Sequence, residues 1–261
     1  MSSSGCPVKH DKSGSESATV MTPHGLRPAG AKCPVEHGSS SSSTLDPRNF
    51  MPSDLANQPQ ANQAIELPTE RTVSSIPRVI DPSESAAVAA AGAGSGYAAS
   101  AEDTNWVYPS PQQFYNALVR KGWETPEEHV EMMVQIHNFL NEGCWDEVVQ
   151  WERRFHPQDS EDVKLLRLQG RPRDLSPKAW FMSTFMGAPR PFDRHDWFVD
   201  RNGKTVRYVI DYYEGEPEAP GVPVFHVDVR PAVDDPTSAW DRLRMAWSKA
   251  RDKYTSRTAN N

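Results

Sequence analysis

The sequence predicts an α+β fold: a mostly helical domain with a small antiparallel sheet, preceded by a long disordered N-terminal region. Of the 9 Phe, 8 Trp and 7 Tyr residues, only Phe50 and Tyr97 precede residue 105, so nearly all of the large apolar surface lies in the C-terminal part. In that part, apolar residues first recur at helical spacing and later alternate with polar residues around an Asn-Gly pair.

Residues 1–48 are predicted to form a disordered tail, because they have almost nothing to bury. The tail contains a repeat in which Cys6 and Cys33 each begin the pattern Cys-Pro-Val-x-His. A Cys-Pro pair in a flexible segment is typical of a heme regulatory motif, in which the thiolate binds ferric heme. Two Cys and two His are also a zinc-binding set, and two thiols can form a disulfide in an oxidising compartment. Spacing alone leaves all three interpretations open.

Residues 49–104 are predicted to be an extended arm followed by an Ala/Gly-rich spacer. The apolar residues scattered between 49 and 78 stand among Asn, Gln and Pro, so this arm becomes ordered only by docking onto another surface. Residues 81–103 have no second apolar face and are predicted to be a loop or a weak helix.

The globular domain is predicted over residues 105–250, with a C-terminal tail over 251–261. Pro111 stands where a first-turn proline belongs, which predicts a helix that ends near Gly122. Thr125 and Glu128 predict a capping box for a second helix, which the apolar stripe extends to about Phe155. A shorter helical stretch is predicted over 163–168.

A change of periodicity after residue 176 predicts the sheet. Residues 197–200 and 206–212 are predicted to be two strands joined by the Asn202-Gly203 turn. Residues 224–229 are a candidate third strand, and Asp235-Pro236 introduces a last helix.

Composition excludes several classes of protein. The net charge of −7, from 28 basic and 35 acidic residues, gives no general attraction to phosphate backbones, so nucleic acid is not an expected partner. No stretch approaches the ~20 apolar residues that a membrane span needs, and residues 1–10 lack a secretory signal or a cleaved transit peptide. Three cysteines are too few for a disulfide framework. These features alone predict a soluble intracellular protein.

Two histidines are candidate functional residues. His137 lies on the apolar stripe of the second predicted helix, with Asn138, Asn141 and Glu142 close to it in sequence. Such a histidine is more often a core residue than a ligand, but polar neighbours of this kind can orient an imidazole. His195 stands among charged residues, which fits a catalytic group, a clamp for a porphyrin propionate or an ordinary loop network.

Several blocks of sequence occur together in this chain. They are the paired Cys-Pro-Val motifs, WVYPSPQQFYNALVRKGW at 106–123, IHNFLNE at 136–142, PFDRHDW at 191–197, RYVIDYY at 207–213 and DVRPA at 228–232. Through them the chain resembles the holocytochrome c-type synthases, also called cytochrome c heme lyases. The blocks cover most of the region from 106 to 247, and together they are highly specific for the family.

The resemblance implies a lyase that attaches heme b covalently to apocytochrome c, with the heme in its ferrous form. It implies peripheral association with the mitochondrial inner membrane on the intermembrane-space side, which replaces the intracellular assignment made from composition. In this family the histidine of the IHN block, here His137, is an axial ligand of the heme iron. The CxxCH histidine of the apocytochrome supplies the other ligand and brings two thiols beside the heme vinyl groups.

The resemblance also suggests roles for other residues. His137, Asn138 and Glu142 are the candidate catalytic residues. The further candidates for heme binding are two tail cysteines, three aromatic pocket walls, an orienting amide, two propionate partners and a second histidine: Cys6, Cys33, Trp106, Tyr115, Trp123, Asn141, Arg194, Arg207 and His195. Cys144 is expected to be a small buried residue.

Two rival functions come from other classes of protein. One is a heme carrier or sensor that binds heme through Cys6, Cys33 and His137 without forming a covalent bond. The other is an interaction module with a zinc-binding tail. Nothing in the sequence chooses between cytochrome c and cytochrome c1 as the substrate.

Overall fold

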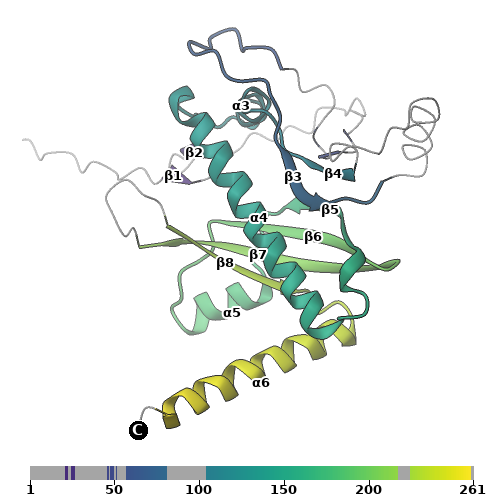
Figure 1. The fold of residues 1–261 in the computed structure, drawn as a ribbon. Helices are drawn as coiled ribbons and strands as arrows, with labels where there is room; N and C mark the ends of the chain where they lie inside the picture. The colour runs from purple at the N-terminus through teal and green to yellow at the C-terminus, as the bar shows by residue number, and fades with distance from the viewer. Residues whose placement is uncertain are drawn as a thin grey trace, which may run out of the picture.

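The computed structural model describes residues 21–22, 25–26, 46, 48–49, 51, 57–80, 104–216 and 224–259 (Figure 1). The predicted disordered tail lies largely outside these residues, including Cys6 and Cys33, and so does the predicted spacer over 81–103. Within the tail, the backbone of β1 (Met21–Thr22) pairs with that of β2 (Gly25–Leu26).

A four-stranded antiparallel sheet is the centre of the fold. Its strands are β5 (Val163–Gly170), β6 (Asp193–Arg201), β7 (Lys204–Gly215) and β8 (Val224–Pro231), in the spatial order β5-β6-β7-β8. Asn202 and Gly203 join β6 to β7 with φ values of 49° and 82°, the positive values that a tight two-residue hairpin turn requires. The predicted hairpin and third strand are therefore confirmed.

The prediction of a helix over residues 163–168 is wrong, because this segment is strand β5 at the edge of the sheet. Its pairing with β6 shifts register between Leu165 and Arg167, which leaves Leu166 out of the one-to-one pairing. Such a bulge changes which residues of a strand point to one face. The apolar residues therefore fall at 163, 165, 166 and 168, a spacing that imitates a helix.

The long helix α4 (Val130–Phe155) lies across one face of the sheet (Figure 1). It buries Cys144, Trp145, Val148 and Trp151 against the large side chains of β6 and β7 in the main core. The predicted capping box at Thr125 is wrong. A 3-10 turn, η1 (Glu127–His129), precedes the helix, and His129 at the N-cap makes no side-chain capping bond.

Helix α3 (Pro111–Arg120) packs on the first turns of α4. Pro111 occupies its first position as predicted, and Ser110 and Gln113 form a reciprocal capping box. The helix ends just before Gly122, whose φ is 71°. A second apolar cluster lies between the two helices and consists of Leu67, Phe114, Leu118, Val130, Met133 and Val134.

The segment predicted to be an extended arm contacts the domain along its length. Its strand β3 (Val73–Pro77) pairs antiparallel with β4 (Asn105–Val107), and Ile76 is buried in the main core. Beyond β3, the backbone N–H of Val79 donates to the carbonyl of Leu165 at 3.0 Å, so the arm continues along the edge of β5. The segment before the domain therefore contributes to its core.

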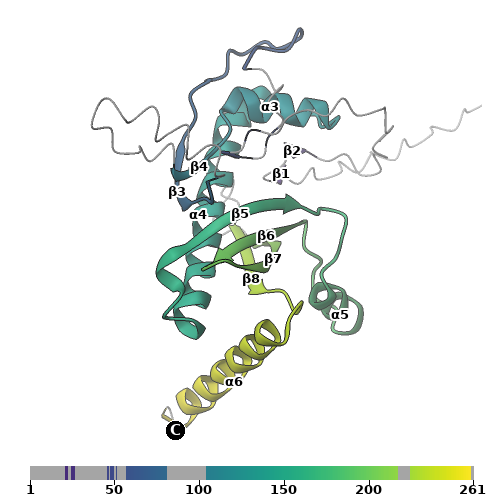
Figure 2. The same ribbon diagram turned by 90° about the vertical axis from the view of Figure 1, so that its right-hand side faces the viewer.

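Helices α5 (Pro177–Phe185) and α6 (Pro236–Ala259) lie at the end of the molecule away from α3, as both ribbon views show (Figures 1 and 2). The start of α6 is held against the end of α4, where His156 Nε2 lies 2.7 Å from Asp241 Oδ2. Helix α6 also continues past residue 250, through the segment that the sequence assigned to a tail.

Candidate functional site

His137 projects from α4 toward α3. Its side chain is half-buried, and its ring centroid lies 5.8 Å from that of Phe114, with the two planes tilted by 53°. The helical spacing places it beside the second apolar cluster, next to residues of the preceding turn such as Met133. An imidazole in this setting has one apolar aromatic wall and remains partly accessible.

The amide of Asn141 orients this imidazole. Asn141 is buried, and its Nδ2 lies 3.2 Å from His137 Nδ1. An asparagine presents either an oxygen or an NH₂ group after rotation, so the same side chain can accept a hydrogen bond from Nδ1–H. In that tautomer Nε2 carries the lone pair through which a histidine ligates a metal, and it points away from Asn141.

Asn138, the residue after His137 in α4, has a buried side-chain oxygen, Oδ1, that lacks a hydrogen-bond partner among the described residues. A buried polar atom without a partner is costly, so each one calls for an explanation, such as a functional role or a bound water. The predicted neighbours Asn138 and Asn141 are thus both on the half of α4 that carries His137.

Glu142, a candidate catalytic residue, lies where α4 meets strand β3 of the arm. Its carboxylate accepts hydrogen bonds from Ser74 Oγ at 2.5 Å, from Tyr108 OH at 2.9 Å and from the Ser75 hydroxyl. Burial alone would raise the pKa of Glu142, but these hydrogen bonds outweigh it and lower the pKa. The ionised carboxylate therefore fastens strand β3 of the arm to the helix that carries His137.

The three predicted aromatic walls divide between the two apolar clusters. Trp106 is buried in the main core beside Tyr108. Tyr115 and Trp123 are partly buried against the second cluster, which also contains Phe114. The structure therefore brings Tyr115 and Trp123, rather than Trp106, to the α3–α4 side of the molecule.

His195 lies in strand β6 on the face that meets α4. Its Nε2 is 3.1 Å from Asp193 Oδ2, and its Nδ1 is 3.4 Å from the Tyr212 hydroxyl. That hydroxyl lies 3.6 Å from the sulfur of Cys144, which is fully buried as expected. His195 thus belongs to a buried polar chain through the main core.

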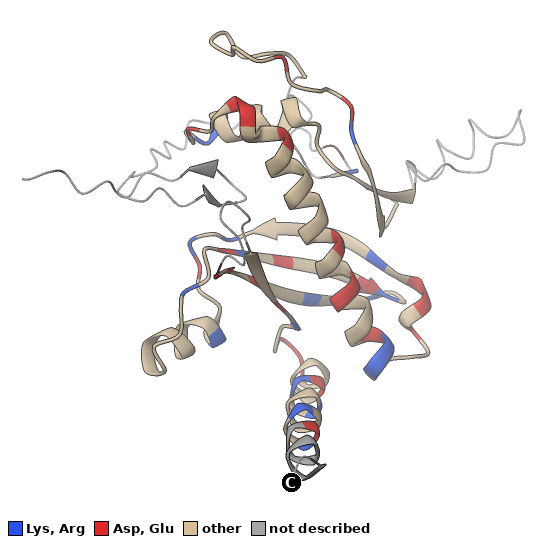
Figure 3. Ribbon diagram, turned by 60° about the vertical axis from the view of Figure 1, so that its left-hand side comes forward, with Lys and Arg blue, Asp and Glu red and all other residues tan. Residues whose placement is uncertain are grey.

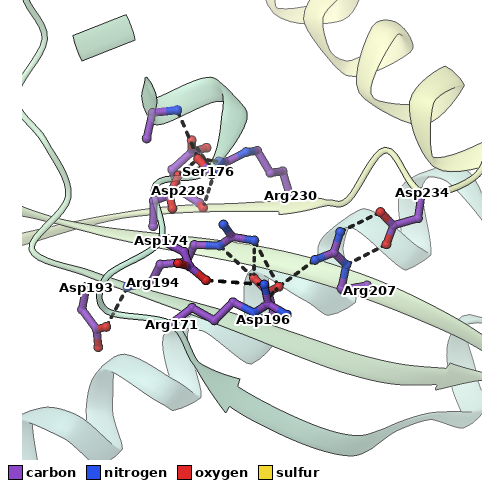
Figure 4. A network of polar contacts seen from close by, with 12 residues as sticks. Arg171, Asp174, Ser176, Asp193, Arg194, Asp196, Arg207, Asp228, Arg230 and Asp234 are labelled. Carbon is purple, nitrogen blue, oxygen red and sulfur yellow. Dashed lines mark hydrogen bonds and ion pairs between the residues drawn. The ribbon is translucent and has the colours of Figure 1, made fainter. Parts of the chain in front are cut away.

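Arg194 and Arg207 lie on the opposite face of the sheet from α4, because residues of a strand alternate between faces and Trp197 and Tyr208 face the helix. Both guanidinium groups bind the fully buried carboxylate of Asp196, at 2.9 and 2.7 Å (Figure 4). Arg207 also pairs with Asp234, and hydrogen bonds to that carboxylate raise the pKa of Arg207. This placement does not bring the two arginines to His137 as propionate partners.

Sequence reasoning missed Phe114 and the Ser74-Ser75 pair. Phe114 is part of an ordinary amphipathic helix, so its sequence context does not mark it. The serines lie in an arm whose docking register has no local signature. Among the described residues, no group of three or more His, Cys, Asp or Glu side chains is arranged to bind a metal ion.

A partly accessible histidine, held by an amide and bordered by aromatic rings, is typical of a site that takes a flat metal-bearing cofactor through one axial ligand. The α+β fold with a histidine placed in this way defines a class of protein in which one side chain can serve as a metal ligand. Comparison of the sequence with family models is more specific: residues 1–247 match the model of the cytochrome c/c1 heme lyases, so the chain belongs to that family of lyases, which act on heme and apocytochrome c.

Relatives from fungi and animals agree with this assignment. The chain is 40% identical to the holocytochrome-c synthase of Saccharomyces cerevisiae, over 93% of this chain and 86% of the relative. It is 35% identical to the human holocytochrome c-type synthase over the same shares. It is also 35% identical to a putative holocytochrome-c1 synthase of Schizosaccharomyces pombe, over 82% of this chain and 89% of that one. No solved structure matches the chain.

Proposed function

We propose that this protein binds ferrous heme b through His137 and joins it to apocytochrome c. The observation that carries the proposal is the pairing of His137 with Asn141 beside the Phe114 ring, on a chain of the heme lyase family. The product contains two thioether bonds between the heme vinyl groups and the cysteines of the CxxCH segment.

The bond-forming step is an addition without net oxidation or reduction. The S–H bond and the vinyl π bond break, the sulfur bonds to one vinyl carbon, and the proton that the thiol gives up is balanced by the proton added to the other vinyl carbon. The protein's contribution is orientation: His137 fixes one face of the iron, and the CxxCH histidine of the substrate takes the other. Two such ligands hold the thiols next to the vinyl groups and convert a bimolecular addition into a nearly intramolecular one.

The amides and Glu142 support this arrangement in separate ways. With its amide rotated so that the oxygen accepts from Nδ1–H, Asn141 would hold the imidazole in the tautomer that ligates iron through Nε2. The buried Oδ1 of Asn138, unpaired among the described residues, lies on the same part of α4. Glu142 keeps the arm docked on α4. Tyr115 and Trp123 are proposed as walls of the heme pocket, while Arg194 and Arg207 stabilise the sheet.

We propose that the enzyme works in the mitochondrion, on the intermembrane-space side of the inner membrane, as a peripheral protein. The names of its relatives support a place in cytochrome c maturation. None of the helices in the described part of the chain is both long and apolar enough to span a bilayer. The Cys-Pro-Val motifs at Cys6 and Cys33 are proposed as heme regulatory motifs that deliver heme to the domain.

The decisive experiment is coexpression of each variant with apocytochrome c in cells that lack their own attachment machinery. We expect His137→Ala to abolish both the co-purifying Soret band and the heme-stained cytochrome on a denaturing gel. His129→Ala is the matched control, because it removes an imidazole at the N-cap of α4 whose Nε2 lies 3.7 Å from Glu128. Covalent heme formed by His137→Ala would overturn the proposal, and a heme spectrum of the unchanged protein without any thioether would identify a carrier.

A further inference from the structure

Helix α5 carries aromatic side chains that the protein does not bury. Trp180, Phe181, Phe185 and Met186 are all more than half exposed, and the buried side chain of this helix is Ala179. The rings contact one another instead: Phe185 lies 5.7 Å from Trp180 and 5.2 Å from Phe181 between centroids. A two-turn helix with three exposed aromatic residues has an apolar surface that is available to something outside the chain.

Helix α6 also exposes large apolar side chains, over two turns. Trp240, Leu243 and Trp247 follow one another at helical spacing, and Trp247 is 78% exposed. The opposite side of the helix packs on the protein through Ser238 and Asp241. The exposed apolar residues therefore lie on the side of α6 that faces away from the rest of the protein.

Basic residues accompany both apolar surfaces. The sequence of α6 has six Lys and Arg residues against two Asp, in a chain whose net charge is −7. Figure 3 shows Lys and Arg at several positions along this helix. Residues 177–191, which contain α5, have Arg190 and Lys178 and no acidic residue, and Lys178 pairs with Asp228 of β8 at 2.6 Å, so the basic excess lies mainly on α6.

Trp, Phe and Leu on one side of a helix, with Lys and Arg beside them, are the composition of helices that lie in a membrane interface. Tryptophan is enriched there because its ring is apolar and its N–H is polar. A protein partner would also cover an apolar surface, but the excess of basic residues favours an anionic bilayer. Both helices lie at the same end of the molecule in Figures 1 and 2.

We propose that the α5–α6 face binds the surface of an anionic phospholipid bilayer. The residues proposed to contact lipid are the exposed apolar residues of the α5 segment and of α6, together named the α5–α6 face: Trp180, Phe181, Phe185, Met186, Trp240, Leu243 and Trp247. The proposal deepens the peripheral location given above and rests on it for the choice of a membrane partner. In this orientation α3 and the first turns of α4, near His137, lie at the end away from the lipid, where heme and apocytochrome can approach from the aqueous side.

The test is flotation of the full chain with vesicles of phosphatidylcholine and phosphatidylglycerol, and with phosphatidylcholine alone. We expect binding to the mixed vesicles that weakens as salt is raised. The double variants Trp240→Ser with Trp247→Ser, and Phe181→Ser with Phe185→Ser, should each lower the partition coefficient by about tenfold or more, because the bound state loses two buried side chains.

Phe139→Ser is the matched control. Phe139 is 77% exposed on α4, outside the α5–α6 face, so this variant should bind vesicles like the unchanged protein. Thermal unfolding without lipid checks that the double variants remain folded. The proposal would be overturned if the unchanged protein failed to float or if the double variants bound as well as it does. It would also be overturned if the protein formed a dimer that the Trp variants dissociate. Heme attachment in detergent-free solution is measured in parallel, and its persistence in the double variants separates a failed membrane face from a failed enzyme.

Discussion

The amide of Asn141 lies 3.2 Å from Nδ1 of His137, one turn earlier in α4. Asn141 is buried, whereas His137 is only half-buried, so the more enclosed residue fixes the orientation of the more accessible one. A ligand histidine that receives such support presents its other nitrogen in a constant direction.

Asn141→Ala is therefore expected to lower heme affinity by about 10–100-fold, the usual effect of removing a group that orients a metal ligand. Heme titration followed at the Soret band measures this affinity. Gln135→Ala, which removes an exposed amide from the same helix, is the control and should leave the titration unchanged. Equal affinity in Asn141→Ala would mean that the contact does not orient the ligand.

Glu142→Gln is expected to loosen the arm by about 1–2 kcal/mol at neutral pH, since a charged acceptor of several hydrogen bonds becomes neutral. The lowered pKa of Glu142 sets the pH dependence. A carboxylate with a depressed folded pKa stabilises the fold above its ordinary value of 4.5, and this contribution is lost as pH falls through the folded pKa.

The measurement compares the thermal unfolding of Glu142→Gln and the unchanged protein across the acid range. The difference in Tm between them should be largest near neutral pH and should shrink below pH 4.5. Ser75→Ala removes one donor and should give a smaller difference with the same trend. A constant difference in Tm down to the lowest pH would contradict this account of Glu142.

Local patterns predicted the parts of the fold that depend on local chemistry. The α3 start at Pro111 and the hairpin at Asn202-Gly203 follow from the backbone preferences of the residues themselves. The bulge in β5 could not be predicted in this way, because it arises from the pairing of β5 with β6. It gives Leu166 a spacing from its apolar neighbours that resembles that of a helix.

Long-range contacts explain the limits of the site prediction. The histidine and its amide lie within one helix, so their spacing in the sequence brings them together. Glu142 accepts from Ser74 and Ser75, which are 68 and 67 residues away, and from Tyr108, which is 34 residues away. Arg194 binds Asp196, and the alternation of side chains along β6 places both on the face away from α4. A charge pattern shows which groups are present, but it does not show which of them already neutralise each other.

Asp196→Asn tests the role of Arg194 and Arg207, which lie on the face of the sheet away from α4. It leaves Arg194 and Arg207 without the charge of a fully buried partner, so we expect a loss of about 3–5 kcal/mol in the free energy of unfolding. Urea denaturation measures this loss. Heme affinity of the protein that remains folded should be unchanged, and a fall in that affinity would indicate that these arginines contact heme.

Cys6→Ala combined with Cys33→Ala separates heme delivery from heme attachment. The thioether chemistry is assigned to the domain that carries His137, so the double variant should keep most of its holocytochrome yield when heme is abundant. When heme is limiting, the yield should fall if these thiols deliver it. Complete loss of attachment at high heme would show instead that the Cys-Pro-Val motifs take part in the reaction.

The remaining cysteine, Cys144, is expected to resist alkylation in the folded protein. Burial raises the pKa of its thiol to about 12, although the hydrogen bond with Tyr212 acts in the opposite direction. The thiol is thus protonated at pH 8 and shielded from solvent, while alkylation requires an accessible thiolate. In the Cys6→Ala, Cys33→Ala background, iodoacetamide should modify the protein only after urea is added, as measured by intact mass. Rapid modification of the native protein would contradict the packing of α4 on β7.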